Sequence, residues 1–104
     1  MIVELRTYRL NVGKVAEWLT YYEKQGLPVQ QKHLGEPLGF FSSDIGELNE
    51  VIHMWGYTSH DDRENRRSNL FKDPAWRTYL VNQPPVLLSQ SNRILLPTSF
   101  SQIK

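Results

Sequence analysis

Two kinds of apolar periodicity, one typical of strands and one typical of helices, follow one another along the chain. Their order is the feature that most constrains the fold. Strand-like alternation predicts four strands, at Ile2–Leu10, Gly35–Ser43, Glu50–Tyr57 and Leu87–Leu96. Apolar side chains recur at helical spacing around Trp18, after the first strand, and around Trp76, after the third. Because β-α-β crossovers are right-handed, the order β-α-β-β-α-β predicts a ferredoxin-like α+β fold: a four-stranded antiparallel sheet with both helices on one face.

Capping residues and prolines predict where the helices begin and end. Gly26 and Pro28 should interrupt the first helix, since proline lacks the backbone donor that a continuing helix needs. The alternative is that Pro28 opens a short second helical turn through His33. Ser59, with Asp62 three residues later, predicts the start of a second helix. Asp73 followed by proline predicts a fresh helical start within the same region.

Length and composition exclude several classes of function. The 104 residues fit a single domain over residues 1–104, and 12 basic against 11 acidic residues leave a net charge of +1. That balance gives no case for nucleic acid as a partner. The absence of cysteine excludes disulfides, thiolate zinc sites and iron–sulfur clusters. With no long apolar run and no leader pattern, we expect a cytoplasmic protein without membrane insertion.

Alternation in the two central strands places the chemically interesting side chains on one face. The side chains on this face are Glu4, Arg6, Tyr8, His53, Trp55 and Tyr57. The opposite face carries Val3, Leu5, Ile52 and Met54, which we expect to turn toward the helices. Together with Trp18 and Leu19, Ile52 and Met54 should therefore be buried between helix and sheet. The polar and aromatic set would then occupy the open face.

Three interpretations of that open face follow. It is solvated, or a second copy covers it with Glu4 and Arg6 as a structural ion pair, or two opposed sheets enclose a cavity there. His53 is the candidate general base, because its unperturbed pKa lies near neutrality. No second histidine lies near it in sequence, so we expect no metal site. Motifs for nucleotide binding, serine hydrolysis and zinc proteolysis are absent, and no cofactor is indicated.

The segment Asp61–Asn69 is almost entirely polar. Its arginines, Arg63, Arg66 and Arg67, could hold a phosphate or a carboxylate. Three carboxylates lie in the same segment, and Asp62 stands four residues before Arg66. We therefore interpret the segment as a solvated helix face.

Seven blocks of sequence resemble successive blocks of the NIPSNAP family. They are ELRTYRL (Glu4–Leu10), GKVAEWL (Gly13–Leu19), GLPVQQKHLG (Gly26–Gly35), GFFSSDIGELNEVIHMWGY (Gly39–Tyr57), DDRENRR (Asp61–Arg67), DPAWRTYL (Asp73–Leu80) and NRIL (Asn92–Leu95). The resemblance implies the dimeric α/β-barrel superfamily, in which two ferredoxin-like protomers pack sheet against sheet. Relatives include cofactor-less monooxygenases and heme-binding enzymes. It carries over no catalytic residue.

The preferred hypothesis is a homodimeric small-molecule-binding protein of the NIPSNAP family with its pocket between the opposed sheets. Glu4, Arg6, Tyr8, His53, Trp55 and Tyr57 would bind the ligand. One alternative is an oxygenase-like enzyme without cofactor that uses the same pocket, with His53 as base and Arg6 holding an anion. The other is an interaction module whose charged helix meets a partner protein. The sequence does not decide whether the protein is an enzyme.

Overall fold

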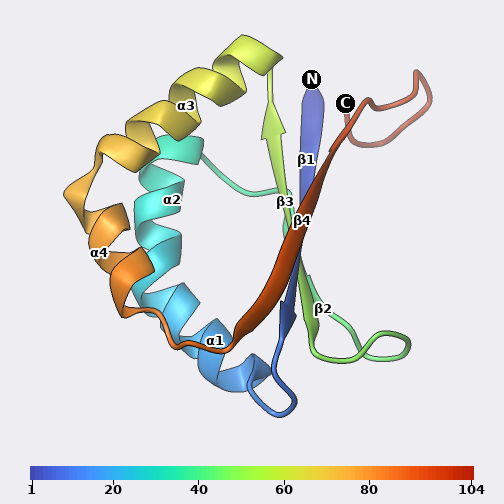
Figure 1. Ribbon diagram of the computed structural model, residues 1–104. Helices are drawn as coiled ribbons and strands as arrows, with labels where there is room; N and C mark the ends of the chain where they lie inside the picture. The colour runs from blue at the N-terminus through green and yellow to red at the C-terminus, as the bar shows by residue number, and fades with distance from the viewer.

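Strand β1 (Ile2–Leu10) runs through the interior of a four-stranded antiparallel sheet in the computed structural model, which describes residues 1–104 (Figure 1). The sheet order is β2-β3-β1-β4, with β2 at Gly39–Ser42, β3 at Glu50–Tyr57 and β4 at Leu87–Leu95. The predicted ferredoxin-like α+β fold is confirmed. Strand β2 is shorter than the predicted segment, with four residues on the edge of the sheet.

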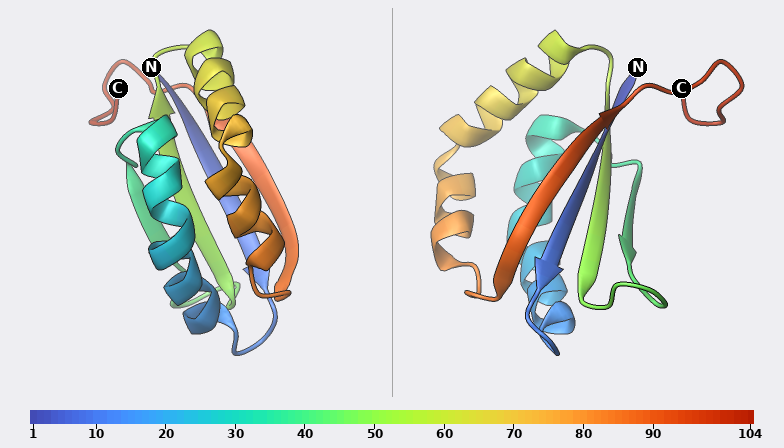
Figure 2. Two further views of the ribbon diagram at one scale, coloured as in Figure 1. Left: turned by 90° about the vertical axis from the view of Figure 1, so that its left-hand side faces the viewer. Right: turned by 45° about the vertical axis from the view of Figure 1, so that its right-hand side comes forward.

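Two helical arms cover one face of the sheet and lie side by side (Figure 2). One arm contains α1 (Val15–Tyr21), a π-helical turn η1 (Tyr22–Gly26) and α2 (Leu27–Leu34); the other contains α3 (His60–Lys72) and α4 (Pro74–Asn82). None of these helices is both long enough and apolar enough to cross a membrane.

Two predicted helix starts are confirmed, and one predicted break is wrong. The Ser59 hydroxyl accepts from the Asp62 amide at 3.1 Å, and the Asp73 carboxylate accepts from the Ala75 amide at 2.9 Å. The expected interruption at Gly26 and Pro28 does not occur. The first arm continues through η1. The alternative is confirmed, because Pro28 occupies the first turn of α2, where its missing donor is tolerated.

The π-helical turn has a geometric reason in the spacing of buried residues. Along the first arm these are Trp18, Tyr22, Gly26, Gln30 and Leu34, one at every fourth position. In an uninterrupted α-helix with 3.6 residues per turn, a four-residue repeat drifts by about 40° at each step. A π-turn, with its i→i+5 bonds, is wider and takes up part of that drift. The turn therefore helps to keep one face of the arm on the sheet.

Strand register shows that the predicted orientation of the two sheet faces is reversed. Arg6 pairs with His53 and Glu4 with Trp55, as the alternation predicts, but these side chains lie beneath the helices. Glu4, His53 and Trp55 are each at most 1% exposed within the single chain. The physical reason is that the helices supply the matching groups. Aromatic rings pack on His53, and arginines of α3 neutralise Glu4.

The opposite face of the sheet has no helix against it. Leu5, Ile52 and Met54 are half-buried there, and Phe41 on β2 is 56% exposed. The prediction that Ile52 and Met54 pack between helix and sheet is therefore wrong. Trp18 is buried between the layers as predicted, and Leu19 is half-buried against the same core.

The residues after β4 turn onto the open side of the sheet, away from the helices (Figure 1). There Leu96 and Ile103 border a shallow hollow together with Val3 and Met54. Val3 is consequently buried at 3% exposure although no helix covers it. The tail thus shields one end of the open face. Leu5 and Ile52, farther along the same face, are half-buried and have no helix over them.

Candidate ligand-binding site

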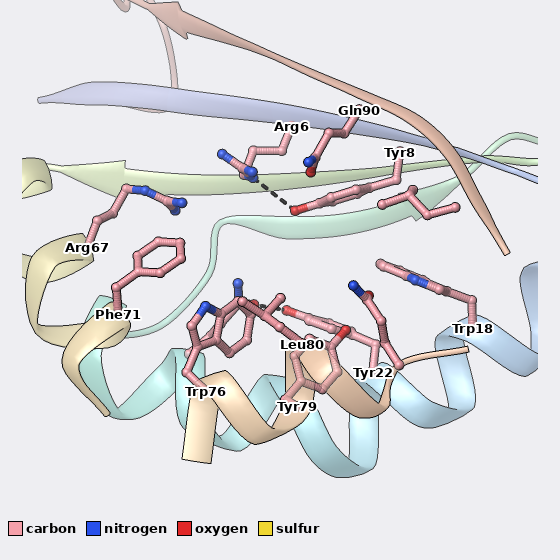
Figure 3. Close-up of a pocket in the computed structure, with 13 residues that line it drawn as sticks. Arg6, Tyr8, Trp18, Tyr22, Arg67, Phe71, Trp76, Tyr79, Leu80 and Gln90 are labelled. Atoms are coloured by element: carbon pink, nitrogen blue, oxygen red, sulfur yellow. Dashed lines mark hydrogen bonds between the residues drawn. The ribbon is translucent and has the colours of Figure 1, made fainter. Parts of the chain in front are cut away.

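A cavity of about 230 Å³ lies between the sheet and the helical layer (Figure 3). Its aromatic lining comes from Tyr8, Trp18, Tyr22, Phe71, Trp76 and Tyr79, and its other lining from Arg6, Gln30, Arg67, Leu80, Gln83, Leu87 and Gln90. Phe71 on α3 and Gln90 on β4 are also exposed, so the cavity opens to solvent on the β4 side of the layer. Apolar walls with a few polar groups are typical of small-molecule sites.

Arg6 is held in the cavity wall by a partner on each side of it along β1. Its Nε donates to the Tyr8 hydroxyl at 2.9 Å (Figure 3), and its Nη1 donates to Glu4 Oε2 at 3.0 Å. The alternation of β1 places all three side chains on the helix-covered face. These two bonds fix the direction of the guanidinium and leave other donors on it unused.

Glu4 is the centre of a buried charge cluster behind the cavity. Its Oε2 accepts from Arg63 Nη2 and from Asn92 Nδ2, each at 2.8 Å, and its Oε1 lies 3.9 Å from Arg67 Nη1. Burial by itself raises the pKa of Glu4. The bonds from Arg63 and Asn92, with the charges of Arg6 and Arg67, outweigh burial and lower the pKa to about 2. Glu4 is therefore ionised at neutral pH.

The cluster carries more positive than negative charge. Arg6, Arg63 and Arg67 all pair with Glu4, and none of them pairs with another carboxylate. Three positive charges against one negative charge leave an excess of two. Arg6 and Arg67 both line the cavity, and the Arg67 guanidinium stands 5.6 Å from the centre of the Phe71 ring. One end of the cavity is therefore positively charged and also aromatic.

His53 is enclosed by four aromatic rings rather than by polar groups. The ring centres of Phe40, Tyr22, Tyr8 and Trp18 lie 4.6, 4.7, 5.1 and 5.8 Å from that of the imidazole. Burial lowers the pKa of His53 to about 4, and the nearby charge of Arg6 contributes in the same direction. The imidazole is therefore neutral at pH 7.

The structure divides the six predicted site residues among three positions, although all share one face. Arg6 and Tyr8 line the cavity, while Glu4 stands behind them as their ionic partner. His53 lines a separate cavity of about 260 Å³. Trp55 and Tyr57 are buried in the core and line neither cavity. A ligand-binding role for the six residues stays a prediction.

Sequence reasoning missed the half of the cavity that the helices supply. Arg66 pairs with Asp62 at 2.8 Å, as its four-residue spacing predicts, but Arg63 and Arg67 point inward to Glu4. The signal was present in the spacing. Arg63, Arg67 and Phe71 recur at four-residue intervals and so share one face of α3. The interpretation of the whole segment as a solvated face is corrected accordingly.

The fold and the cavity together define a ferredoxin-like α+β protein with a basic, aromatic-lined pocket beneath its helices. The NIPSNAP family model matches residues 3–102. The chain is 39% identical to a NIPSNAP family protein with unknown function from Agrobacterium tumefaciens, with a TM-score of 0.95 covering 100% of this chain and 94% of that one. This chain belongs to the NIPSNAP family.

Curated relatives are longer proteins. The chain is 34% identical over 100 residues to Protein NipSnap of Drosophila melanogaster, covering 96% of this chain and 36% of that protein. It thus spans about a third of that relative's length. An antibiotic biosynthesis monooxygenase superposes with a TM-score of 0.64 over 94% of this chain and 99% of its own, at 7% identity. That likeness shows a shared fold.

Proposed function

We propose that this NIPSNAP domain is a homodimeric small-molecule-binding protein that takes up an aromatic acid between its own sheet and helices. The location differs from the pocket between opposed sheets that the sequence suggested. The observation that carries the proposal is the cavity in which Arg6 and Arg67 face aromatic walls.

Charge indicates which end of the ligand would meet the arginines. The cluster around Glu4 has two positive charges in excess, and Arg6 and Arg67 line the cavity with side chains that are only 16% and 17% exposed. A carboxylate at this position would accept charge-assisted hydrogen bonds from guanidinium groups, whose planar geometry suits it. It would also reduce the repulsion among the arginines.

Volume and lining indicate the rest of the ligand. Apolar cavities of roughly 150 Å³ hold benzene, so a space of about 230 Å³ suits a single substituted ring. Trp76 and Tyr79 stack on each other with ring centres 4.9 Å apart and form one wall. A planar ring bearing a carboxylate therefore satisfies both the walls and the positive end.

The dimer would form through the open face of the sheet, where Leu5, Ile52 and Met54 lie without helical cover. A central apolar strip on a sheet favours burial against a second copy. In this arrangement the ligand lies inside each protomer. The domain, residues 1–104, would therefore need the dimer for stability and not to close the pocket.

We place this protein in the cytoplasm, as expected from its composition.

The test uses benzoate, phenylacetate and phenyl phosphate as probes and benzamide as the neutral analogue, measured by calorimetry. We expect the acids to bind more tightly than benzamide. Arg67→Gln should weaken acid binding by about tenfold or more, because a hydrogen bond to a charged group contributes about 1.5–3 kcal/mol. Arg66→Gln is the matched control, since Arg66 pairs with Asp62 and does not line the cavity.

Two results would contradict the proposal. One is equal affinity for benzoate and benzamide in the unmodified protein. The other is an equal loss of affinity in Arg66→Gln and Arg67→Gln, which would place the anion outside the cavity.

A further inference from the structure

His53 has no hydrogen-bond partner on either ring nitrogen although it is only 1% exposed. Most buried polar side-chain atoms in proteins are paired, so a fully unpaired imidazole needs an explanation. The rings of Tyr8 and Tyr22 pack on the imidazole, but their hydroxyls bond elsewhere: Tyr8 accepts from Arg6, and Tyr22 donates to Gln30. No protein group makes a hydrogen bond to either ring nitrogen of His53.

The imidazole also lines a cavity of its own. This second cavity, of about 260 Å³, lies toward β2, whereas the cavity at Arg6 lies toward β4. Tyr22 lines both, so its ring stands between the two spaces. The apolar walls of the second cavity come from Leu19, Leu27 and Phe40. The structure thus presents an unpaired hydrogen-bonding group in the wall of this chamber, which is lined mainly by apolar side chains and opens to solvent past Thr20 and Phe40.

We propose that His53 is the recognition group of a second binding site, which takes a small neutral aromatic alcohol of the phenol class. A neutral imidazole has one donor and one acceptor nitrogen, and a phenolic hydroxyl can serve either. The ring would lie among Leu19, Leu27 and Phe40. Charge argues against an acid here, because Glu23 lines this cavity and is exposed at its rim.

The charge state of His53 agrees with this choice. Burial and the charge of Arg6 lower its pKa to about 4, so the acceptor nitrogen is free at pH 7. The two sites would therefore differ in chemistry. The cavity at Arg6 prefers an anion, and the chamber at His53 prefers an uncharged hydroxyl.

The experiment compares p-cresol with toluene, which has nearly the same shape but no hydroxyl, by NMR titration of uniformly ¹⁵N-labelled protein, in which the signals of His53, Arg6 and Gln90 are followed together. In the unmodified protein p-cresol should bind at least about fivefold more tightly, since a buried neutral hydrogen bond contributes about 1 kcal/mol. It should also shift the ring nitrogen signals of His53. His53→Phe should bind the two probes equally, whereas His60→Asn, altered at an exposed position, should keep the preference.

Three outcomes would overturn the inference. The first is equal affinity of p-cresol and toluene for the unmodified protein, a comparison that needs no variant to fold. The second is p-cresol shifting Arg6 and Gln90 but not His53, which would place it in the first cavity. The third is no binding at millimolar p-cresol, which would mean that only water occupies the chamber. Benzoate binding at Arg6 is independent of all three.

Discussion

Glu4 keeps its charge in a fully buried position because three arginines and an amide surround it. A buried ion pair adds little stability compared with apolar packing, but removing one partner leaves the others without compensation. Glu4 is therefore needed less for its attraction to the arginines than for preventing the repulsion among them.

Glu4→Gln should lower the free energy of unfolding by about 3–5 kcal/mol, since Arg6, Arg63 and Arg67 would lose their shared anion. Urea denaturation at pH 7 measures the change. Glu50→Gln is the control, because Glu50 pairs with a half-exposed Arg9 and should lose less than about 1 kcal/mol. Equal losses would show that the charge cluster has no special role.

His53 should make stability depend on pH above the range in which carboxylates titrate. Its folded pKa of about 4 lies below the ordinary histidine value of 6.5, so between these values the unfolded chain binds a proton that the folded chain does not. The contribution is complete above pH 6.5 and is lost as pH falls toward 4. Glu4, with a folded pKa of about 2 against an ordinary value of 4.5, acts below pH 4.5 and so overlaps only the lower end of the His53 window.

The free energy of unfolding should therefore fall by up to about 1.4 kcal/mol per pH unit between pH 6 and 5. Denaturant titrations at several pH values measure this slope. His53→Phe should remove most of it, while His60→Asn should leave it unchanged because His60 is exposed. If His53→Phe kept the full slope, another group would be responsible.

At the scale of elements, η1 brings the two helical arms into close contact. A Cβ atom added at Gly26 would stand 2.8 Å from two carbon atoms of the Tyr79 ring and 3.0 Å from Tyr22. Both rings are buried in the core, and the Tyr79 ring is stacked on Tyr21 and Trp76, so it has little room to withdraw. Glycine is needed here for space rather than for backbone freedom.

Gly26→Ala should consequently destabilise the fold by about 1–3 kcal/mol through overpacking, despite the better helix propensity of alanine. Gln25→Ala, at an exposed position in the same turn, should change stability by less than about 0.5 kcal/mol. Thermal denaturation of both variants measures the difference. If Gly26→Ala left the midpoint of thermal denaturation unchanged, the two helical arms could separate without loss of stability.

The elements themselves were largely predictable because their signals are local. Alternation gave the strands, and Ser59 and Asp73 gave two helix starts. The face that the helices cover was not predictable in the same way. Both faces of β3 carry large side chains, and the choice between His53 and Met54 depends on groups from α1 and α3 that are distant in sequence. For the same reason only Arg6 and Tyr8 of the cavity lining were among the predicted site residues, and the side chains that the helices contribute were missed.

At the scale of the whole molecule, the reversal of faces moves the expected dimer contact. Trp55 lies inside the protomer, so a charge there would disrupt the core rather than an interface. The strip around Leu5, Ile52 and Met54, which no helix covers and which the C-terminal tail borders at Met54, is the surface that a second copy would bury. The proposed dimer contact and the proposed ligand pocket would then be on opposite sides of one sheet.

Met54→Glu should convert the proposed dimer to a monomer, because an unpaired carboxylate buried in an apolar interface is strongly unfavourable. Light scattering at micromolar concentration measures the mass. Val81→Glu introduces the same charge on the outside of α4, where the side chain is 83% exposed, and should leave the dimer intact. A monomeric unmodified protein would refute the dimer.

The bonds of Glu4 also bear on how quickly the chain can fold. Its partners Arg63 and Asn92 lie 59 and 88 residues away in sequence, and β1 gains its two neighbours only when β3 and β4 arrive. Contacts of such large sequence separation require closing long loops and are typical of slow folding. The cluster should therefore form late, after the transition state. Its loss would then accelerate unfolding more than it would retard folding, so the buried charges would act chiefly to prolong the lifetime of the native state.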